Sequence, residues 1–189
     1  MCQSAHILGR VLEHRSHKKT CIDSQIRFNE AQQLHDTLAS LTRHLAQKYT
    51  QEGFAATGCR LVAISLCYSA RLILYHIYLD KETQINEKCV SESEAATLYE
   101  MSLSGTEKMI SGVYELAQHV VAFKNGDFPR FGPLICHTLY QGASVCSSFV
   151  REHGEQGPIK DLKPIIESLR ILGRRWKITG IFGDSSLKR

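Results

Sequence analysis

The sequence has 189 residues, 43% hydrophobic and 22% charged, a composition that excludes a disordered chain and a collagen-like fibre. This length suits one domain of ordinary size. Lys and Arg outnumber Asp and Glu by 23 to 19, and the resulting charge of +4 permits an acidic partner without requiring one. All four prolines lie between Pro129 and Pro164, so the preceding chain can form long helices. We therefore expect an all-α protein of about six to seven amphipathic and buried helices, with no substantial sheet.

The cysteine pattern indicates reduced thiols. There are 7 cysteines, an odd number, with no Cys-x-x-Cys pair, and several lie inside apolar stretches. This pattern is typical of free cysteines that are buried as small apolar side chains in an intracellular protein. The N-terminal segment lacks the charged lead and apolar core of a secretory signal.

Helical spacing of apolar residues predicts the first two helices. In the opening helix these residues are Ala5, Ile7, Leu8, Val11 and Leu12. In the second, over residues 27–49, they are Leu34, Leu38, Leu41 and Leu45. The second pattern fits either a coiled-coil seam or an amphipathic helix docked on the domain. Because it covers barely two heptads, the docked helix is favoured.

Residues 60–79 are almost entirely apolar or small, which predicts a third, long helix. Its length would allow it to span a bilayer, but Arg71 near its centre would cost about 2.5–3.5 kcal/mol on membrane insertion. A central helix buried on most sides is the favoured interpretation, and a membrane span is the alternative.

The fourth helix begins at a capping box formed by Ser91 and Glu94, three residues apart. Its apolar stripe continues to Asn125 and Gly126, which signal a C-cap. Gly105 lies inside this run, and a break or kink is expected near it, because glycine costs about 1 kcal/mol relative to alanine in a helix interior.

Prolines mark the first turns of two further helices. Pro133 predicts the start of a fifth helix, in which Gly142 is one of several small residues that would let another helix approach. Its expected buried face comprises Leu134, Thr138, Leu139, Gly142, Ala143, Cys146, Phe149 and Val150. The sixth helix is expected to have Asp161 as its N-cap and Pro164 in its first turn. Its expected buried face comprises Leu162, Ile165, Ile166, Leu169, Leu172 and Trp176. We expect one helical unit over residues 1–178 and a loose tail over 179–189.

No catalytic, cofactor-binding or metal-ligating residue is predicted, and we expect no enzyme and no cofactor. Cys2 with His6, and His14 with His17, have local spacings that could contribute to a zinc site. Neither pair is a Cys-x-x-Cys motif, which supplies two of the four ligands of a tetrahedral zinc site from one short segment. Ser144 follows two small residues but lies in a helical pattern, unlike the serine of a nucleophile elbow.

Two other classes of function remain as alternatives. A small helical ligand-binding protein or enzyme would use a pocket between long helices, lined by Tyr68, His76, His119 and His137. The same four residues are equally explained as polar groups satisfied within the fold. Sequence-independent nucleic-acid binding would use the basic segments 10–19 and 170–177, which lack interleaved aromatic residues for stacking.

Four segments occur together in an order that is similar to a known family. They are AHILGRVLEH at 5–14, ISLCYSARLILYH at 64–76, PLICHTLYQGASV at 133–145 and LKPIIESLRILGRRW at 162–176. Their combination resembles the regulatory "middle homology" domain of fungal binuclear zinc cluster transcription factors, over about residues 3–178. In that family a late proline opens a helix with small residues, matched by Pro133, Gly142 and Ala143. A leucine-rich helix then ends in tryptophan, matched by Leu169, Leu172 and Trp176.

This resemblance implies a helical regulatory domain of a nuclear transcription factor. Its implied partners are proteins of the transcription machinery or a second copy of the chain, and a small-molecule effector is compatible with it. The family's six-cysteine zinc cluster is not in this sequence, which looks like the C-terminal portion of the regulatory domain. We therefore expect no zinc, no direct DNA contact and no membrane, and we expect the isolated chain to self-associate or be unstable through uncovered apolar faces.

Overall fold

The computed structural model describes residues 2–16, 24–49, 54–79, 91–122, 133–153 and 162–173. Within these ranges the chain forms six helices and no strand, which confirms the expected all-α class. The helices are α1 (Cys2–Ser16), α2 (Ser24–Tyr49), α3 (Phe54–Leu79), α5 (Glu92–Ala122), α6 (Pro133–His153) and α7 (Lys163–Gly173). The predictions for His17, Asn125, Gly126, Asp161, Trp176 and the tail 179–189 lie outside the described residues.

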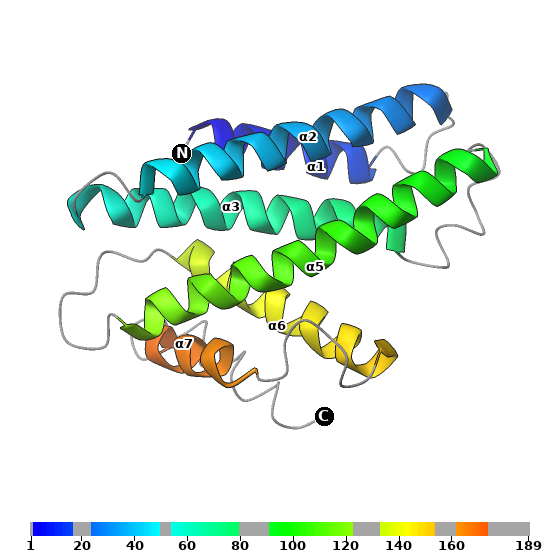
Figure 1. Cartoon of the computed structure of the whole chain (residues 1–189). Coiled ribbons are helices and arrows are strands. Elements are labelled where there is room, and N and C mark those ends of the chain that lie inside the picture. Colours follow the sequence, from blue (N-terminus) through cyan, green and yellow to red (C-terminus); the bar gives the residue numbers. More distant parts are fainter. Residues whose placement is uncertain are drawn as a thin grey trace.

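Helix α3 lies in the middle of the molecule. It packs against α1 and α2 on one side and against α5 and α6 on the other, while α7 packs on α5 and α6 (Figure 1). Two hydrophobic clusters result. The first joins α3, α5, α6 and α7, and the second joins α1, α2 and α3 with Leu98 of α5.

Helix α3 is apolar along most of its length because both clusters use it. Leu66 and Leu72 belong to the first cluster, whereas Cys67, Ala70 and Leu74 belong to the second. The segment Cys59–Leu79 is long and apolar enough to cross a membrane, yet 78% of its most apolar part is buried inside the protein. This burial is that of a core helix, as the sequence favoured.

The opening helix is confirmed, but only some of its apolar residues are buried. Ile7 and Val11 are buried as expected, whereas Leu12 is 46% exposed and Ala5 is exposed. Ser4 and His14 complete the buried face instead. Positions 4, 7, 11 and 14 follow spacings of three and four residues and so share one side of the helix.

Helix α2 is docked on α1 and α3, as favoured over a coiled-coil seam. Leu34 and Leu38 are buried, and Leu41 and Leu45 are half-buried against the same cluster. The four leucines therefore share one face, as predicted.

The capping box at the start of α5 is confirmed. The Ser91 N–H donates to Glu94 Oε2 at 3.2 Å, and the Glu94 N–H donates to Ser91 Oγ at 3.4 Å. The expected break near Gly105 is wrong, since α5 is helical throughout its length. The glycine at position 105 leaves room for the Tyr75 ring, because a Cβ placed there would lie 2.3 Å from Cζ of Tyr75.

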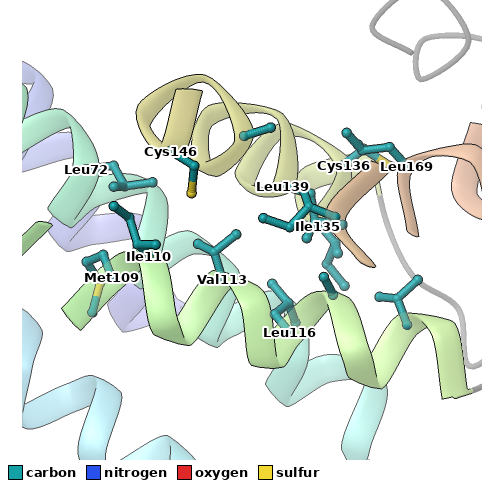
Figure 2. Packing of buried hydrophobic residues seen from close by; sticks show 14 of the residues in the cluster. Leu72, Met109, Ile110, Val113, Leu116, Ile135, Cys136, Leu139, Cys146 and Leu169 are labelled. Atoms are coloured by element: carbon teal, nitrogen blue, oxygen red, sulfur yellow. The ribbon is translucent and has the colours of Figure 1, made fainter. Parts of the chain in front are cut away.

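Helix α6 begins at Pro133, as predicted, and packs closely on α5. Figure 2 shows Leu139 and Cys146 of α6 facing Val113 of α5. A Cβ at Gly142 would lie 2.4 Å from Cγ1 of Val113, which confirms that the glycine permits close helix approach. Leu134 is a correction: it is 45% exposed, because the buried face of α6 begins at Ile135.

In α7, the buried apolar residues are Ile165, Leu169 and Leu172, all among those predicted. Pro164 stands in the first turn. Leu162, directly before α7, and Ile166 are half-buried.

Candidate functional site

Three of the four residues of the pocket alternative are exposed. His76, His119 and His137 are exposed on three different helices, α3, α5 and α6. Tyr68 is half-buried, and its ring packs where a Cβ on Gly112 would lie 2.7 Å from the hydroxyl oxygen. Burial raises the pKa of Tyr68, with the charge of Glu115 adding to the effect. The sequence placed polar residues correctly on helices but not in one site.

A cleft lies between α1 and α2, with a volume of about 610 Å³. Two residues of α1 line it, Arg10 and His14, and five of α2, Ile26, Arg27, Asn29, Glu30 and Gln33. The two helices supply these side chains from facing turns, because α2 runs along α1 (Figure 1).

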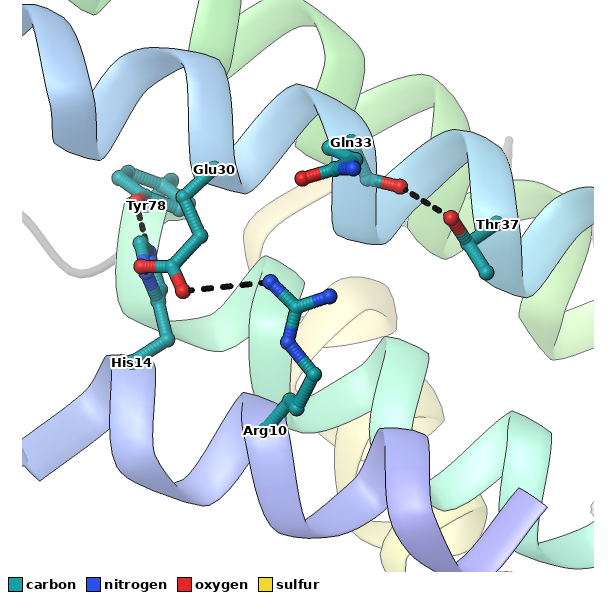
Figure 3. Close-up of polar contacts among 6 residues, drawn as sticks. All are labelled: Arg10, His14, Glu30, Gln33, Thr37 and Tyr78. Atoms are coloured by element: carbon teal, nitrogen blue, oxygen red, sulfur yellow. Dashed lines mark hydrogen bonds and ion pairs between the residues drawn. The ribbon is translucent and has the colours of Figure 1, made fainter. Parts of the chain in front are cut away.

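His14 joins three helices beneath this cleft. Its side chain is 0% exposed, its Nδ1 lies 2.6 Å from Glu30 Oε2, and its Nε2 lies 2.6 Å from the Tyr78 hydroxyl oxygen (Figure 3). A carboxylate can only accept, so Nδ1 carries the proton shared with Glu30. In the neutral imidazole Nε2 then accepts from the Tyr78 hydroxyl. The chain from Glu30 through His14 to Tyr78 ties α2 and α3 to α1.

The pKa of the Glu30 carboxyl group reflects these contacts. Burial alone would raise the pKa of the carboxyl group, but the hydrogen bond with His14, the charge of the His14 ring in its protonated form and the charge of Arg10 outweigh it. The pKa is therefore lowered from its ordinary value of 4.5. Arg10 Nη2 lies 3.6 Å from Glu30 Oε1, so the carboxylate is held from both sides.

A second buried polar group lies between α2 and α3. The Arg71 Nε–H donates to the Tyr75 hydroxyl at 2.9 Å, and that hydroxyl lies 3.0 Å from His35 Nδ1. Arg71 is only 6% exposed, and its guanidinium stands 5.6 Å from the centre of the Tyr75 ring. Burial and the charge of Arg71 lower the pKa of His35. The ring contact and the hydroxyl together help to accommodate a buried cation.

These networks are better suited to holding helices than to chemistry. His14 is fully buried, so no substrate reaches its ring. In the described part of the chain, no group of three or more His, Cys, Asp and Glu side chains could hold a metal ion. Cys2 and His6 are both exposed on α1, and Ser144 is exposed on α6.

The sequence carried one signal for His14 that the prediction did not use. Position 14 is three residues after Val11 and seven after Ile7, in phase with the buried face of α1. Its partners Glu30 and Tyr78 are distant in sequence, by 16 and 64 residues, so only the fold reveals them.

Comparison with known proteins identifies no relative. No protein-family model, curated protein or solved structure matches this chain.

Proposed function

We propose that this chain is a regulatory and protein-interaction part of a fungal transcription factor of the binuclear zinc cluster class, acting in the nucleus. The observation that carries the proposal is the joint order of the four segments at 5–14, 64–76, 133–145 and 162–176. Their described parts lie in or directly beside four separate helices, α1, α3, α6 and α7, all packed into the same helical body. A helical scaffold of this kind supports contacts with proteins through its exposed faces.

Among the described residues, three large apolar side chains are exposed and offer contact points. They are Leu12 at 46%, Ile26 at 59% and Leu134 at 45%. Single exposed apolar residues are common, so each must be tested separately. Replacement by aspartate would remove apolar contact area at an interface while leaving the buried core intact.

A tethering experiment tests the proposal. The full chain is fused to an unrelated DNA-binding domain in yeast, and output from a reporter gene is compared with that of the DNA-binding domain alone. We expect at least a threefold change in either direction, and a return toward the baseline in at least one of Leu12→Asp, Ile26→Asp and Leu134→Asp. An exposed α5 residue provides the matched control, Ser104→Asp, which should keep the wild-type output. Unchanged output with a stably expressed fusion would contradict the proposal.

A gel-shift measurement separates this function from nucleic-acid binding. We expect the purified chain to leave the mobility of duplex DNA unchanged at low salt. A retarded band whose affinity falls steeply with salt would instead support electrostatic binding by the basic segments.

The second candidate function is that of a small helical ligand-binding protein. The α1–α2 cleft favours it, since this volume lies within the range of small-molecule sites. For this function the ligand would contact the residues that line the cleft. His76, His119 and His137, which the sequence suggested as pocket residues, are exposed on other helices.

A further inference from the structure

A buried arginine lies where α2, α3 and α5 pack against one another (Figure 1). Arg71 of α3 is only 6% exposed, and its Nε–H donates to the Tyr75 hydroxyl at 2.9 Å. That hydroxyl lies 3.0 Å from Nδ1 of His35 on α2. It also packs against α5 at Gly105, where a Cβ would lie 2.7 Å from the hydroxyl oxygen. The lack of a Cβ at Gly105 therefore makes room for the hydroxyl that holds one edge of the guanidinium group.

No carboxylate of the described residues pairs with the Arg71 guanidinium group. Glu115 of α5 and Arg71 both influence the pKa of Tyr68, but they form no ion pair with each other. Arg71 Nη1 and Nη2 have no hydrogen bond within the described ranges, and neither is among the fully buried polar atoms that lack a partner. Both nitrogens therefore touch solvent. Because a buried cation is costly unless it is paired, these N–H groups favour an anion.

The charges that act on the neighbouring His35 ring have a positive surplus. They are those of Arg71, of Lys108 on α5 and of Asp36 on α2, which makes two cations and one carboxylate. Lys108 and Asp36 are both exposed, and neither forms an ion pair with any residue that the structure describes. Positive charge at this junction is therefore not already taken up by contact with a carboxylate of the described chain, and the local field attracts an anion.

The His35 ring is a built-in reporter for the charge of Arg71. Among the described residues the Tyr75 hydroxyl has no acceptor other than His35, so it accepts from Arg71 and donates to His35 Nδ1. The neutral ring then carries its proton on Nε2. Burial and the charge of Arg71 hold the pKa of His35 below its ordinary value. An anion bound to Arg71 would offset that charge and raise the pKa of His35.

We propose that Arg71 binds a small oxyanion, a phosphate or carboxylate group, at the junction of α2, α3 and α5. Its Nη1 and Nη2 donate to the oxygens of the anion, since a guanidinium group forms two parallel hydrogen bonds to either acidic group. Lys108 adds attraction from the surface. Because Arg71 is only 6% exposed, the acidic group itself reaches the guanidinium group and a bulky ligand does not. The site would take its anion whether or not the chain regulates transcription.

The test is a titration of the full chain with inorganic phosphate and, separately, with acetate, followed by NMR signals of the Arg71 Nε–H and the His35 ring. Sodium chloride at equal ionic strength is the control. We expect at least one of the two oxyanions to cause saturable shifts of both signals and to raise the pKa of His35 above its value in chloride. The oxyanion that binds identifies the acidic group. Absence of saturable shifts with both oxyanions would overturn the proposal.

Three variants separate a site at Arg71 from a response to overall charge. Arg71→Met keeps an apolar stem without the charge and should abolish saturable binding, and the binding anion should raise the Tm of the wild type but not that of this variant. Lys108→Gln should weaken binding by about threefold, because an exposed charge contributes modestly. Arg15→Gln removes an exposed charge from α1 and should leave affinity unchanged.

Lys108→Gln and Arg15→Gln keep the comparison decisive if Arg71→Met does not fold, because both replace exposed side chains. Equal affinity in these two variants would overturn the proposal, since the anion would then respond only to overall charge. Undiminished binding by a folded Arg71→Met protein would overturn it as well.

Discussion

Replacing Gly142 with alanine should destabilise the protein, although the same change usually favours a helix. Gly142 is buried on α6 against α5, and a new Cβ would lie 2.4 Å from Cγ1 of Val113 and 3.1 Å from its Cβ and Cγ2. Val113 is 0% exposed and branched at Cβ, so it has little freedom to move aside.

The expected magnitude follows from two opposing contributions. Overpacking a core costs about 1–3 kcal/mol, and alanine gains about 1 kcal/mol over glycine in a helix interior. Because the contact is far shorter than van der Waals distance, we take the upper part of the first range and expect a net loss of about 1–2 kcal/mol. For a chain of this size each kcal/mol corresponds to about 2–4 °C in Tm.

Urea unfolding followed by far-UV circular dichroism measures this loss. The matched control is Gly9→Ala in α1, where nothing lies within 4 Å of the new Cβ. It should stabilise the protein by up to about 1 kcal/mol. In a Val113→Ala background the two Cγ contacts are gone, and Gly142→Ala should cost less than about 0.5 kcal/mol, a coupling expected for residues in direct contact. A Gly142→Ala protein as stable as the wild type, or an undiminished cost in the Val113→Ala background, would refute the packing argument.

Three further predictions follow from local features. The lowered pKa of Glu30 contributes stability that is present above its unfolded-state value near 4.5 and is lost as pH falls through the folded-state value; acid unfolding of Glu30→Gln should therefore show a weaker pH dependence than the wild type. Ser91→Ala removes the capping box of α5 and should cost about 1 kcal/mol in urea unfolding, whereas exposed Ser104→Ala should cost nothing measurable. Among the five cysteines in the described ranges, mass spectrometry after brief treatment with a thiol reagent near neutral pH should find Cys2 and Cys59 modified before the three buried ones. Burial raises the pKa values of those three, to about 11 for Cys136 and about 12 for Cys146, and also upward for Cys67. Equal modification of all five in the folded protein would contradict their burial.

Local sequence signals determined where several helices begin and what kind they are. Pro133 starts α6, and Ser91 with Glu94 starts α5, because both act within one turn of the chain. The apolar residues of 60–79 predicted that α3 is a core helix, because a helix that is apolar on all sides must be covered by other parts of the protein. Each of these features depends on neighbours in sequence, which is why the sequence sufficed.

The tertiary structure alone decided which polar residues enter the interior and where a cleft forms. His14 belongs to the basic segment 10–19, yet it is buried because Glu30 and Tyr78 lie on two other helices and bond its ring nitrogens. Gly105 was expected to weaken α5 and instead accommodates the ring of Tyr75. Leu12 and Leu134 are exposed because no other described element covers their side of the helix. Burial of a polar group and exposure of an apolar one both depend on partners far away in the chain, and periodicity along one helix carries no information about those partners.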